Sequence, residues 1–305
     1  MRRDVLSIMD FSKEELIALF EETKRIKKEL EERTTLNYLR GYVMATAFFE
    51  PSTRTKLSFQ TAMLRMGGEF IDLPPEEASS RAKGENFADT IKMLESYADV
   101  IVIRHKLEGA ARFAAEIAEV PVINGGDGTR DHPTQAMIDL FTIFETLGRV
   151  EGLTIGVIGD LKYGRAARSF VLGISKFKPK KLYLVSPPQL SLHDDVKEII
   201  IENGVRFEEL TDLKQVIADI DVLYVTRIQR ERFPDPLEYE RVKGSYRVGL
   251  DILSGAKSEL VILHPLPRVD ELDLSLDKTP YAKYFVQAKN GVPVRMALLK
   301  TILKG

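Results

Sequence analysis

Composition and charge place the chain among globular proteins. It has 305 residues, of which 44% are hydrophobic and 30% are charged, and its formal net charge at pH 7 is −2. A chain of this length usually folds as two domains. The nearly balanced charge argues against a nucleic-acid-binding or membrane-surface protein, so any anion site must come from a local cluster of Arg and Lys.

The residue types narrow the chemistry further. The chain contains no Cys, which excludes disulfides, thiolate metal ligands and a cysteine nucleophile. The four His residues do not pair at metal-ligand spacing, so we predict neither a metal site nor another cofactor. No secretory segment or membrane-spanning run is visible, and we expect a cytoplasmic protein.

The first predicted elements alternate between helices and strands. A helix capped by Ser12 is predicted to run to about Glu32, because apolar residues recur on one face while Lys and Glu fill the other. Strands are then predicted at residues 42–49, 69–73, 100–104 and 120–124, and helices at 53–66, 86–97 and 109–119. This alternation indicates a parallel sheet flanked by helices.

A second alternating set follows a long amphipathic helix predicted at residues 131–147. Its strands are predicted at 153–159, 182–186, 222–226, 247–250 and 261–264, and its helices at 164–177 and 294–303. We therefore predict an α/β fold with two doubly wound parallel-sheet domains joined by the long bridging helix. In such open sheets ligands bind at the carboxyl ends of the strands, where the polar motifs of this chain lie.

The most informative motif is Ser52-Thr53-Arg54-Thr55, which lies between a predicted strand and a predicted helix. A helix N-terminus presents unpaired N–H groups and a positive dipole end, and the hydroxyls and guanidinium add further donors. The pattern favours binding of a compact anion such as phosphate. Taken alone, it fits equally well a Ser/Thr helix cap beside a surface arginine.

Two further motifs open predicted helices. In His132-Pro133-Thr134-Gln135, the His is able to donate to a developing oxyanion and the Gln to bind an amide. A helix cap with a hydrogen-bonded His is the alternative. The turn at residues 160–165 has the glycine spacing of a P-loop, but Arg165-Ala166 stands where Lys-Ser/Thr is required. ATP binding is therefore not favoured, whereas Arg165 suits a carboxylate or phosphate.

Three other polar segments are candidates for substrate contacts. Arg227 and Gln229 follow a predicted strand two residues apart, so an extended chain places both on one face, where they are able to grip a carboxylate. The prolines at residues 264–268 fix the backbone and leave carbonyl groups to accept hydrogen bonds. Residues 79–85 form a polar loop. The respective alternatives are solvated side chains, a simple tight turn and a flexible loop.

Together these motifs resemble the aspartate/ornithine transcarbamoylase family, most closely the catalytic chains of its aspartate members, over essentially the whole chain. The matching motifs occur in the family's order at residues 52–55, 79–85, 132–135, 160–165, 226–229 and 264–268. Ornithine members carry a Cys in the last motif and a Ser-Met-Gly segment, and this chain has neither. Arg227 and Gln229 instead match the pair that aspartate members use for a dicarboxylate.

The resemblance implies that the chain transfers the carbamoyl group of carbamoyl phosphate to L-aspartate, an early step of pyrimidine biosynthesis. The implied catalytic residues are Arg54, Thr55, Lys83, Arg104 and His132. The implied carbamoyl phosphate ligands are Ser52, Thr53, Arg54, Thr55, Ser79, Lys83, Arg104, His132, Gln135, Leu266 and Pro267. The implied aspartate ligands are Lys83, Arg165, Arg227 and Gln229.

The resemblance also implies domains and an assembly. Residues 1–133 and 290–305 are expected to bind carbamoyl phosphate, with the C-terminal helix returning to this first domain, and residues 134–289 to bind aspartate. A homotrimer is expected, in which Lys83 and Ser79 reach a neighbouring subunit's site. Ser79 is preferred to Ser80 on its spacing from Lys83 alone. A separate regulatory chain is left open, and neither nucleic acid nor membrane is an expected partner.

Three alternatives belong beside this interpretation. A transcarbamoylase acting on ornithine or another amine is opposed by the missing Cys and Ser-Met-Gly. A non-catalytic anion-binding subunit is opposed by the presence of all the charged site residues. A nicotinamide-dependent dehydrogenase fits the α/β pattern, but the chain lacks the GxGxxG motif after its strands.

Overall fold

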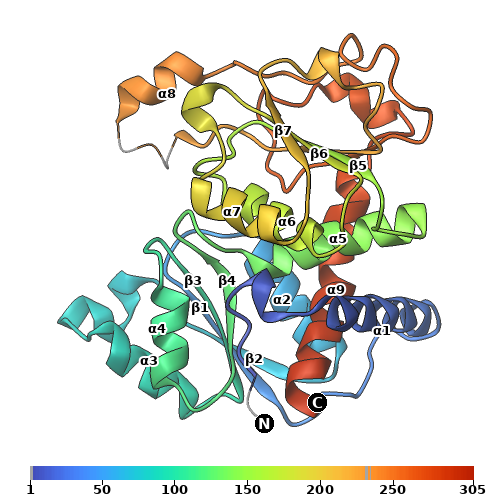
Figure 1. Cartoon of the computed structure of the whole chain (residues 1–305). Helices are drawn as coiled ribbons and strands as arrows, with labels where there is room; N and C mark the ends of the chain where they lie inside the picture. The colour runs from blue at the N-terminus through green and yellow to red at the C-terminus, as the bar shows by residue number, and fades with distance from the viewer. Residues whose placement is uncertain (1–2, 231–232, 234) are drawn as a thin grey trace. The chain divides into compact units, whose positions relative to one another are not determined.

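The computed structural model describes residues 3–230, 233 and 235–305 (Figure 1). The chain forms two compact units. Unit 1 comprises Met1–Thr134 and Gly291–Gly305, and unit 2 comprises Gln135–Asn290. Each unit is built on its own parallel sheet, so the prediction of two parallel-sheet α/β domains is confirmed.

Unit 1 contains a four-stranded parallel sheet with the order β2-β1-β3-β4. The strands are β1 (Val43–Phe48), β2 (Glu69–Asp72), β3 (Val100–His105) and β4 (Val122–Asp127). Residues of β1, β3 and β4 are buried along most of their length, as expected for a sheet with helices on both faces. The carboxyl ends of β1, β3 and β4 therefore lie along one edge and carry the segments that contain the predicted motifs.

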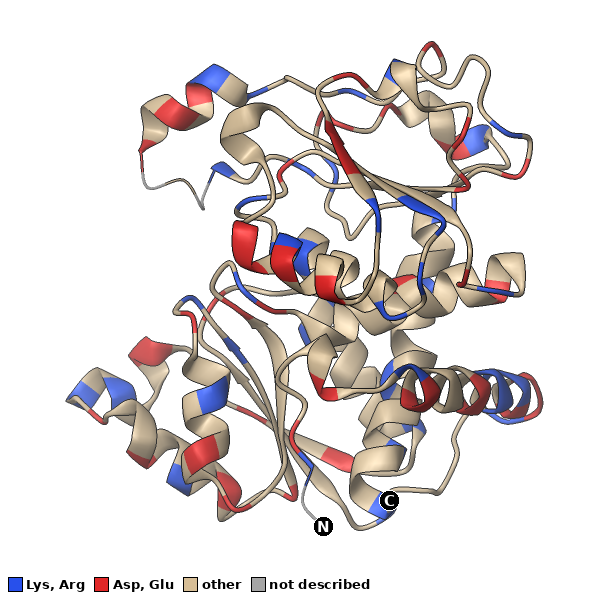
Figure 2. Cartoon of the chain, in the orientation of Figure 1, with Lys and Arg blue, Asp and Glu red and all other residues tan. Residues whose placement is uncertain are grey.

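Helices cover both faces of this sheet (Figure 1). They are α1 (Lys13–Glu32), α2 (Arg54–Arg65), α3 (Phe87–Glu95), α4 (Ala110–Ile117) and the second part of α9 (Tyr284–Lys304), with 3₁₀ turns at Ile8–Asp10, Glu76–Ala78 and Ser80–Lys83. Apolar residues of α3 and α4 pack on one face in a cluster with Ala45, Ile101 and Val122. Acidic and basic residues both occur along the length of α1 (Figure 2).

The start of α1 confirms the predicted helix cap. Ser12 Oγ accepts a hydrogen bond from the Glu15 N–H at 3.2 Å, and the Glu15 carboxylate accepts one from the Ser12 N–H at 2.8 Å. This reciprocal pair satisfies two of the N–H groups that a helix start leaves without partners. Local sequence chemistry alone is therefore enough to set this helix boundary.

Unit 2 contains a five-stranded parallel sheet with the order β7-β6-β5-β8-β9. The strands are β5 (Thr154–Ile158), β6 (Lys181–Val185), β7 (Phe207–Leu210), β8 (Val222–Val225) and β9 (Val261–Leu263). The helices are α5 (Pro133–Leu147), α6 (Arg165–Ser175), α7 (Asp194–Glu202), α8 (Pro236–Val242) and the first part of α9, with 3₁₀ turns at Pro188–Leu190, Leu213–Gln215 and Leu274–Lys278.

The core of unit 2 has two sides. On one side Phe170 of α6 stacks on Tyr224 of β8, with ring centroids 4.3 Å apart and planes 9° from parallel. On the other, Ile217, Leu253 and Tyr284 belong to a large apolar cluster that covers the sheet. Burial of such side chains is the main force that holds the strand ends, and the loops that follow them, in place.

Several predicted elements differ from the structure. Residues 247–250 are not a strand: only Val248 forms a bridge, to Leu272, because the chain turns at once through hydrogen bonds from Ile252 to Gly249 and from Leu253 to Leu250. The elements α7, α8 and β7 were not predicted. The last helix begins at Tyr284, well before the predicted residue 294, and contains Pro293 in its interior.

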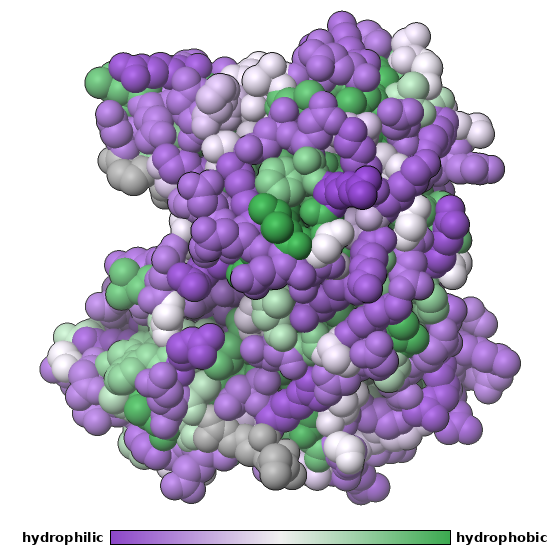
Figure 3. Space-filling view, viewed as in Figure 1, coloured by the Kyte–Doolittle hydropathy of each residue, from purple (hydrophilic) through white to green (hydrophobic). Residues whose placement is uncertain are grey.

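The surface is consistent with a globular chain. On the face shown in Figure 3, hydrophilic residues predominate and apolar residues form only scattered patches. Within the described ranges, no helix combines the length and the apolar character needed to cross a bilayer.

Candidate active site

The predicted anion-binding segment links β1 to α2 in unit 1. Thr53 precedes the first turn of α2 with a helical backbone conformation, φ −87° and ψ −58°, and its side chain makes no capping hydrogen bond. The start of α2 is therefore not an ordinary Ser/Thr cap, which needs an extended residue whose oxygen accepts from the helix. The exposed side chains of Thr53 and Arg54 and the half-buried Ser52 instead stand at the positive end of the helix.

Thr55 and His132 are brought together from distant parts of unit 1. Thr55 Oγ1 lies 3.4 Å from His132 Nε2, and the two residues are only 7% and 5% exposed. Thr55 lies in the first turn of α2, whereas His132 directly precedes Pro133, the first residue of α5. A hydroxyl and an imidazole are thus held side by side near two helix N-termini.

Arg104 lies at the carboxyl end of β3 and is paired with an acidic residue that was not predicted. Its Nε donates to Glu50 Oε1 at 2.7 Å, and its Nη1 lies 3.5 Å from the Gly125 carbonyl oxygen. Both side chains of the ion pair are about five-sixths buried, with 16% and 15% exposed. Glu50 directly precedes Pro51 and the motif that contains Arg54. This position was the only feature of the sequence that could have indicated a role for Glu50.

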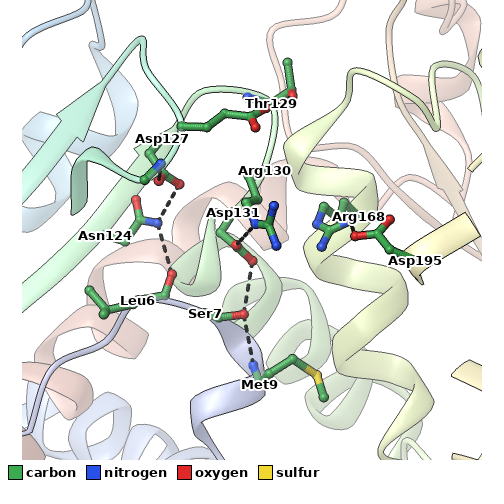
Figure 4. Close-up of polar contacts among 12 residues, drawn as sticks. Leu6, Ser7, Met9, Asn124, Asp127, Thr129, Arg130, Asp131, Arg168 and Asp195 are labelled. Carbon is green, nitrogen blue, oxygen red and sulfur yellow. Dashed lines mark hydrogen bonds and ion pairs between the residues drawn. The ribbon is translucent and has the colours of Figure 1, made fainter. Parts of the chain in front are cut away.

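The segment that leads to His132 is held by a hydrogen-bonded group at the end of β4 (Figure 4). Asn124 Nδ2 donates to Asp127 Oδ1 at 2.8 Å and to the Leu6 carbonyl at 3.0 Å. Ser7 Oγ donates to Asp131 Oδ1 at 3.1 Å. These contacts tie the N-terminal residues of the chain to the turn before α5 and restrict the position of His132.

The predicted shared loop forms two 3₁₀ turns that are largely exposed. Ser79 Oγ donates to the Glu76 carbonyl at 3.0 Å and accepts from Arg81 Nε at 3.3 Å, which are local contacts. Lys83 is exposed. Among the described contacts, none joins Ser79 or Lys83 to Thr55, Arg104 or His132, so this single chain does not bring the loop into the group.

In unit 2, Gln135 and the loop after β9 carry the predicted partners for an amide. Gln135 Nε2 donates to Asp139 Oδ1 at 2.7 Å, one turn further along α5. The Leu266–Pro267 peptide bond is cis, and Leu266 has a positive φ of 54°. Pro267 is exposed and Leu266 half-buried, and neither of their carbonyl groups accepts a hydrogen bond from another described residue.

The turn before α6 and the segment after β8 are joined by Asp160. Its fully buried carboxylate accepts from the Tyr163 N–H at 2.8 Å and from the backbone of Gln229. Burial raises the pKa of Asp160 from 3.8 to about 6, although the backbone hydrogen bonds act in the opposite direction. Asp160 thereby fixes the position of Gln229 relative to the turn that carries Arg165.

Of the four predicted aspartate ligands, Lys83 belongs to unit 1, and Arg165, Arg227 and Gln229 belong to unit 2. Arg165 is the first residue of α6 and is 5% exposed. Arg227 and Gln229 are half-buried in the irregular segment that directly follows β8. A buried guanidinium at a helix start and a second one at a strand end suit an anionic ligand. No group of His, Asp and Glu among the described residues is arranged to hold a metal ion.

Comparison with known proteins identifies the family. Residues 3–145 match the model described as "Aspartate/ornithine carbamoyltransferase, carbamoyl-P binding domain", and residues 151–302 match "Aspartate/ornithine carbamoyltransferase, Asp/Orn binding domain". The chain belongs to the aspartate/ornithine carbamoyltransferase family. The family membership expected from the motifs is therefore confirmed.

Relatives within this carbamoyltransferase family match almost the whole chain. The aspartate carbamoyltransferase catalytic subunit of Thermofilum pendens is 63% identical over 303 residues, covering 99% of this chain and 96% of that protein. The catalytic subunit of M. jannaschii aspartate transcarbamoylase has a TM-score of 0.90 at 48% identity, covering 100% and 98%. Trypanosoma cruzi aspartate transcarbamoylase, in complex with N-(phosphonacetyl)-L-aspartic acid, has a TM-score of 0.94 at 38% identity, covering 99% and 96%.

Proposed function

We propose that this chain is an aspartate carbamoyltransferase, which transfers the carbamoyl group of carbamoyl phosphate to the amine of L-aspartate. The products are N-carbamoyl-L-aspartate and phosphate, and the reaction serves an early step of pyrimidine biosynthesis. The observation that carries the proposal is the start of α2, where the side chain of Thr53 makes no capping hydrogen bond and Ser52 and Arg54 are its neighbours in the chain. The backbone N–H groups and the positive dipole end of a helix N-terminus favour the binding of a phosphate.

Residues of unit 1 are proposed to hold carbamoyl phosphate. Ser52, Thr53, Arg54 and Thr55 bind its phosphate, in keeping with the dipole and donors at the start of α2. Thr55, Arg104 and His132 donate to the carbonyl oxygen, and the 3.4 Å contact between Thr55 and His132 supports their joint action. Gln135 and the carbonyl groups of Leu266 and Pro267 in unit 2 bind the carbamoyl NH₂.

Residues of unit 2 are proposed to select aspartate as the acceptor. Arg165, Arg227 and Gln229 bind its two carboxylates, and the Asp160 hydrogen bonds to the two segments support a fixed spacing between these side chains. A bound dicarboxylate is the ligand that two guanidinium groups and an amide recognise best. Residues 1–133 with 290–305 then bind the phosphate substrate, and residues 134–289 the acceptor.

The chemistry requires positioning and charge neutralisation more than a protein nucleophile. The amine of aspartate attacks the carbonyl carbon, a C–N bond forms, and the tetrahedral oxyanion collapses with cleavage of the bond to the phosphate oxygen. A phosphate oxygen accepts the amine proton. Arg54, Lys83, Arg104, Arg165 and Arg227 supply positive charge against about four negative charges on the two substrates. Proximity and preorganised donors supply the rate.

A homotrimer completes the proposed site. Lys83 and Ser79 lie on a largely exposed loop, and we infer that they enter the site of a neighbouring subunit, where Lys83 contacts both substrates. A single chain would then lack one of the five cations. Activity would therefore depend on assembly. Ornithine is a weaker candidate acceptor, because the chain lacks the Cys and the Ser-Met-Gly segment of ornithine enzymes.

The proposal is tested by mixing the purified chain with carbamoyl phosphate and either L-aspartate or L-ornithine and measuring the carbamoylated product. We expect turnover with aspartate and none with ornithine. Turnover with ornithine alone would overturn the assignment of Arg227 and Gln229 while keeping the phosphate site. Turnover with neither acceptor, in a folded trimer that binds carbamoyl phosphate, would contradict the proposed reaction.

A further inference from the structure

His264 is a buried histidine whose two ring nitrogens both face polar partners. It follows the last residue of β9 and is 1% exposed. Nδ1 accepts a hydrogen bond from the Leu266 N–H at 2.8 Å, and Nε2 lies 2.7 Å from Glu271 Oε1. The ring therefore joins the loop at Leu266 to an acidic side chain on the following segment.

These contacts define one tautomer of the ring. Because Nδ1 accepts a hydrogen bond from the Leu266 N–H, the proton of the neutral ring lies on Nε2, the nitrogen that is 2.7 Å from Glu271 Oε1. Glu271 is 4% exposed and also accepts from the Val269 and Asp270 N–H groups, each at 3.1 Å. Burial lowers the pKa of His264, and hydrogen bonds lower the pKa of Glu271 despite burial. A neutral His264 beside an ionised Glu271 agrees with both pKa directions, although the short contact between Nε2 and the carboxylate lacks hydrogen-bond geometry.

A second branch of contacts leads from His264 to Gln135. The His264 N–H donates to Gln287 Oε1 at 2.8 Å, and Gln287 Nε2 donates to Asp139 Oδ1 at 2.6 Å. The same Asp139 oxygen accepts from Gln135 Nε2 at 2.7 Å. Gln287 and Asp139 are 1% and 0% exposed. One buried chain of hydrogen bonds therefore runs from the loop after β9 to the first turn of α5.

We propose that His264, oriented by Glu271, is a positioning residue that holds the Leu266 carbonyl in register with the Gln135 amide through Gln287 and Asp139. The inference rests on the proposed function, in which these two groups bind the carbamoyl NH₂. Leu266 and Gln135, at the two ends of the network, then bind the same carbamoyl NH₂ group. A histidine that only stabilised the fold would not need to connect these two residues.

The backbone at Leu266 gives a physical reason for such a device. Leu266 has φ +54°, a left-handed conformation that is unfavourable for a bulky residue and persists only where the surroundings fix it. Its N–H is bound by His264 Nδ1, so loss of that acceptor would release the backbone and leave the N–H without a partner. The Leu266 carbonyl would then lose its fixed direction. An amide donor on a substrate depends on that direction.

The test compares three variants at position 264 with the wild-type trimer. His264→Asn keeps an acceptor near Nδ1, His264→Gln keeps a donor near Nε2, and His264→Ala removes both. His193, an exposed histidine of unit 2, provides the control His193→Ala. The measured quantity is the ratio of the dissociation constants for inorganic phosphate and carbamoyl phosphate, since only the second ligand carries the NH₂ group.

We expect this ratio to fall on the order of tenfold in His264→Ala and His264→Gln, which is the effect of losing one well-placed hydrogen bond. His264→Asn should recover most of the preference, and phosphate affinity should stay unchanged throughout. An unchanged ratio in His264→Gln, or an equal loss in His264→Asn and His264→Gln, overturns the inference. A wild-type chain that does not prefer carbamoyl phosphate would instead contradict the proposed function.

Glu271→Gln is a second variant in which the same ratio can be measured if the position 264 variants do not fold. Its amide oxygen keeps an acceptor beside His264 Nε2, but the carboxylate charge is lost. We expect a smaller fall in the same ratio, with an unchanged affinity for phosphate. A ratio equal to that of the wild type in this variant would also count against the positioning role.

Discussion

Thr55 Oγ1 lies 3.4 Å from His132 Nε2, although 77 residues separate them in the chain. The contact joins the start of α2 to the start of α5, so it depends on the whole sheet of unit 1 and not on local sequence. Both side chains are almost completely buried, and a hydrogen bond in such surroundings is stronger than one in water. The contact shows that residues of two sequence motifs lie next to each other in unit 1.

Arg54 is predicted to be essential for turnover. Arg54→Ala removes a charged donor from the start of α2, and we expect kcat to fall by about 10²–10³, the effect of losing one preorganised charge-stabilising group. Arg65→Ala is the matched control, because Arg65 lies exposed at the last residue of the same helix. Initial rates with saturating substrates check the prediction. Near-normal turnover in Arg54→Ala would contradict the assignment of Arg54 to the phosphate of carbamoyl phosphate.

Lys83 is predicted to act in the site of a neighbouring subunit. Lys83→Ala and Arg54→Ala chains should each be inactive, but a refolded mixture should regain part of the activity. In such hybrid trimers some sites combine an intact Arg54 from one chain with an intact Lys83 from the next. Both substitutions remove one positive charge, so the hybrids are separated through an affinity tag on one of the two variant chains before activity is measured. No recovery in proven hybrids would argue that each chain supplies both residues to its own site.

Arg227 is predicted to determine the use of aspartate. Arg227→Ala should raise the KM for aspartate by at least about tenfold while leaving phosphate affinity unchanged, because it removes a charged partner of a carboxylate. Arg230→Ala is the control, since Arg230 is exposed three residues further along. KM values come from aspartate titrations at saturating carbamoyl phosphate. Equal KM values in both variants would contradict the acceptor assignment.

Asp160 is predicted to make stability depend on pH. Its pKa rises from 3.8 to about 6 on folding, so between these pH values the folded chain binds more protons than the unfolded one. Its contribution therefore favours folding increasingly as the pH falls from about 7 to about 4, by about 3 kcal/mol in total. Asp160→Asn lacks this titration. Urea unfolding at several pH values should give wild-type and variant curves with different slopes, and parallel curves would be the contrary result.

Much of the fold follows from sequence chemistry that acts over short distances. The capping box at Ser12 and Glu15 and the apolar stripe behind it define α1 almost to the residue. Buried strands such as β3 and β5 are continuous apolar runs, which is the pattern expected of parallel sheets. The proposed site motifs could also be placed at strand ends, where ligands bind in such sheets.

Strand β7 and the start of α9 could not be predicted, because their sequence patterns are misleading. Strand β7 lies at the sheet edge, and its exposed Glu208 and Glu209 hide the alternation of a strand. The start of α9 was missed because Pro293 normally marks a helix beginning, whereas here it lies inside the helix.

The supporting residues of the site were the least predictable part. Glu50, Glu271 and Asp139 were not predicted, because their roles come from contacts with residues far away in the chain. Gln287 meets Asp139 across 148 positions, and Glu50 meets Arg104 across 54. No spacing rule connects such pairs before the sheets are assembled. The motifs proposed to bind ligands are local in sequence, whereas the groups that contact them come from distant positions.

The central claim is that the phosphate ligands of unit 1 and the carboxylate ligands of unit 2 act on one reacting pair of substrates. Calorimetric titration with N-(phosphonacetyl)-L-aspartate tests it most directly, because this one molecule carries both a phosphonate and a dicarboxylate. We predict one molecule bound per chain, with affinity reduced at least about tenfold by Arg54→Ala and by Arg227→Ala, but not by Arg65→Ala or Arg230→Ala. Binding that is insensitive to either of the first two substitutions would contradict the account.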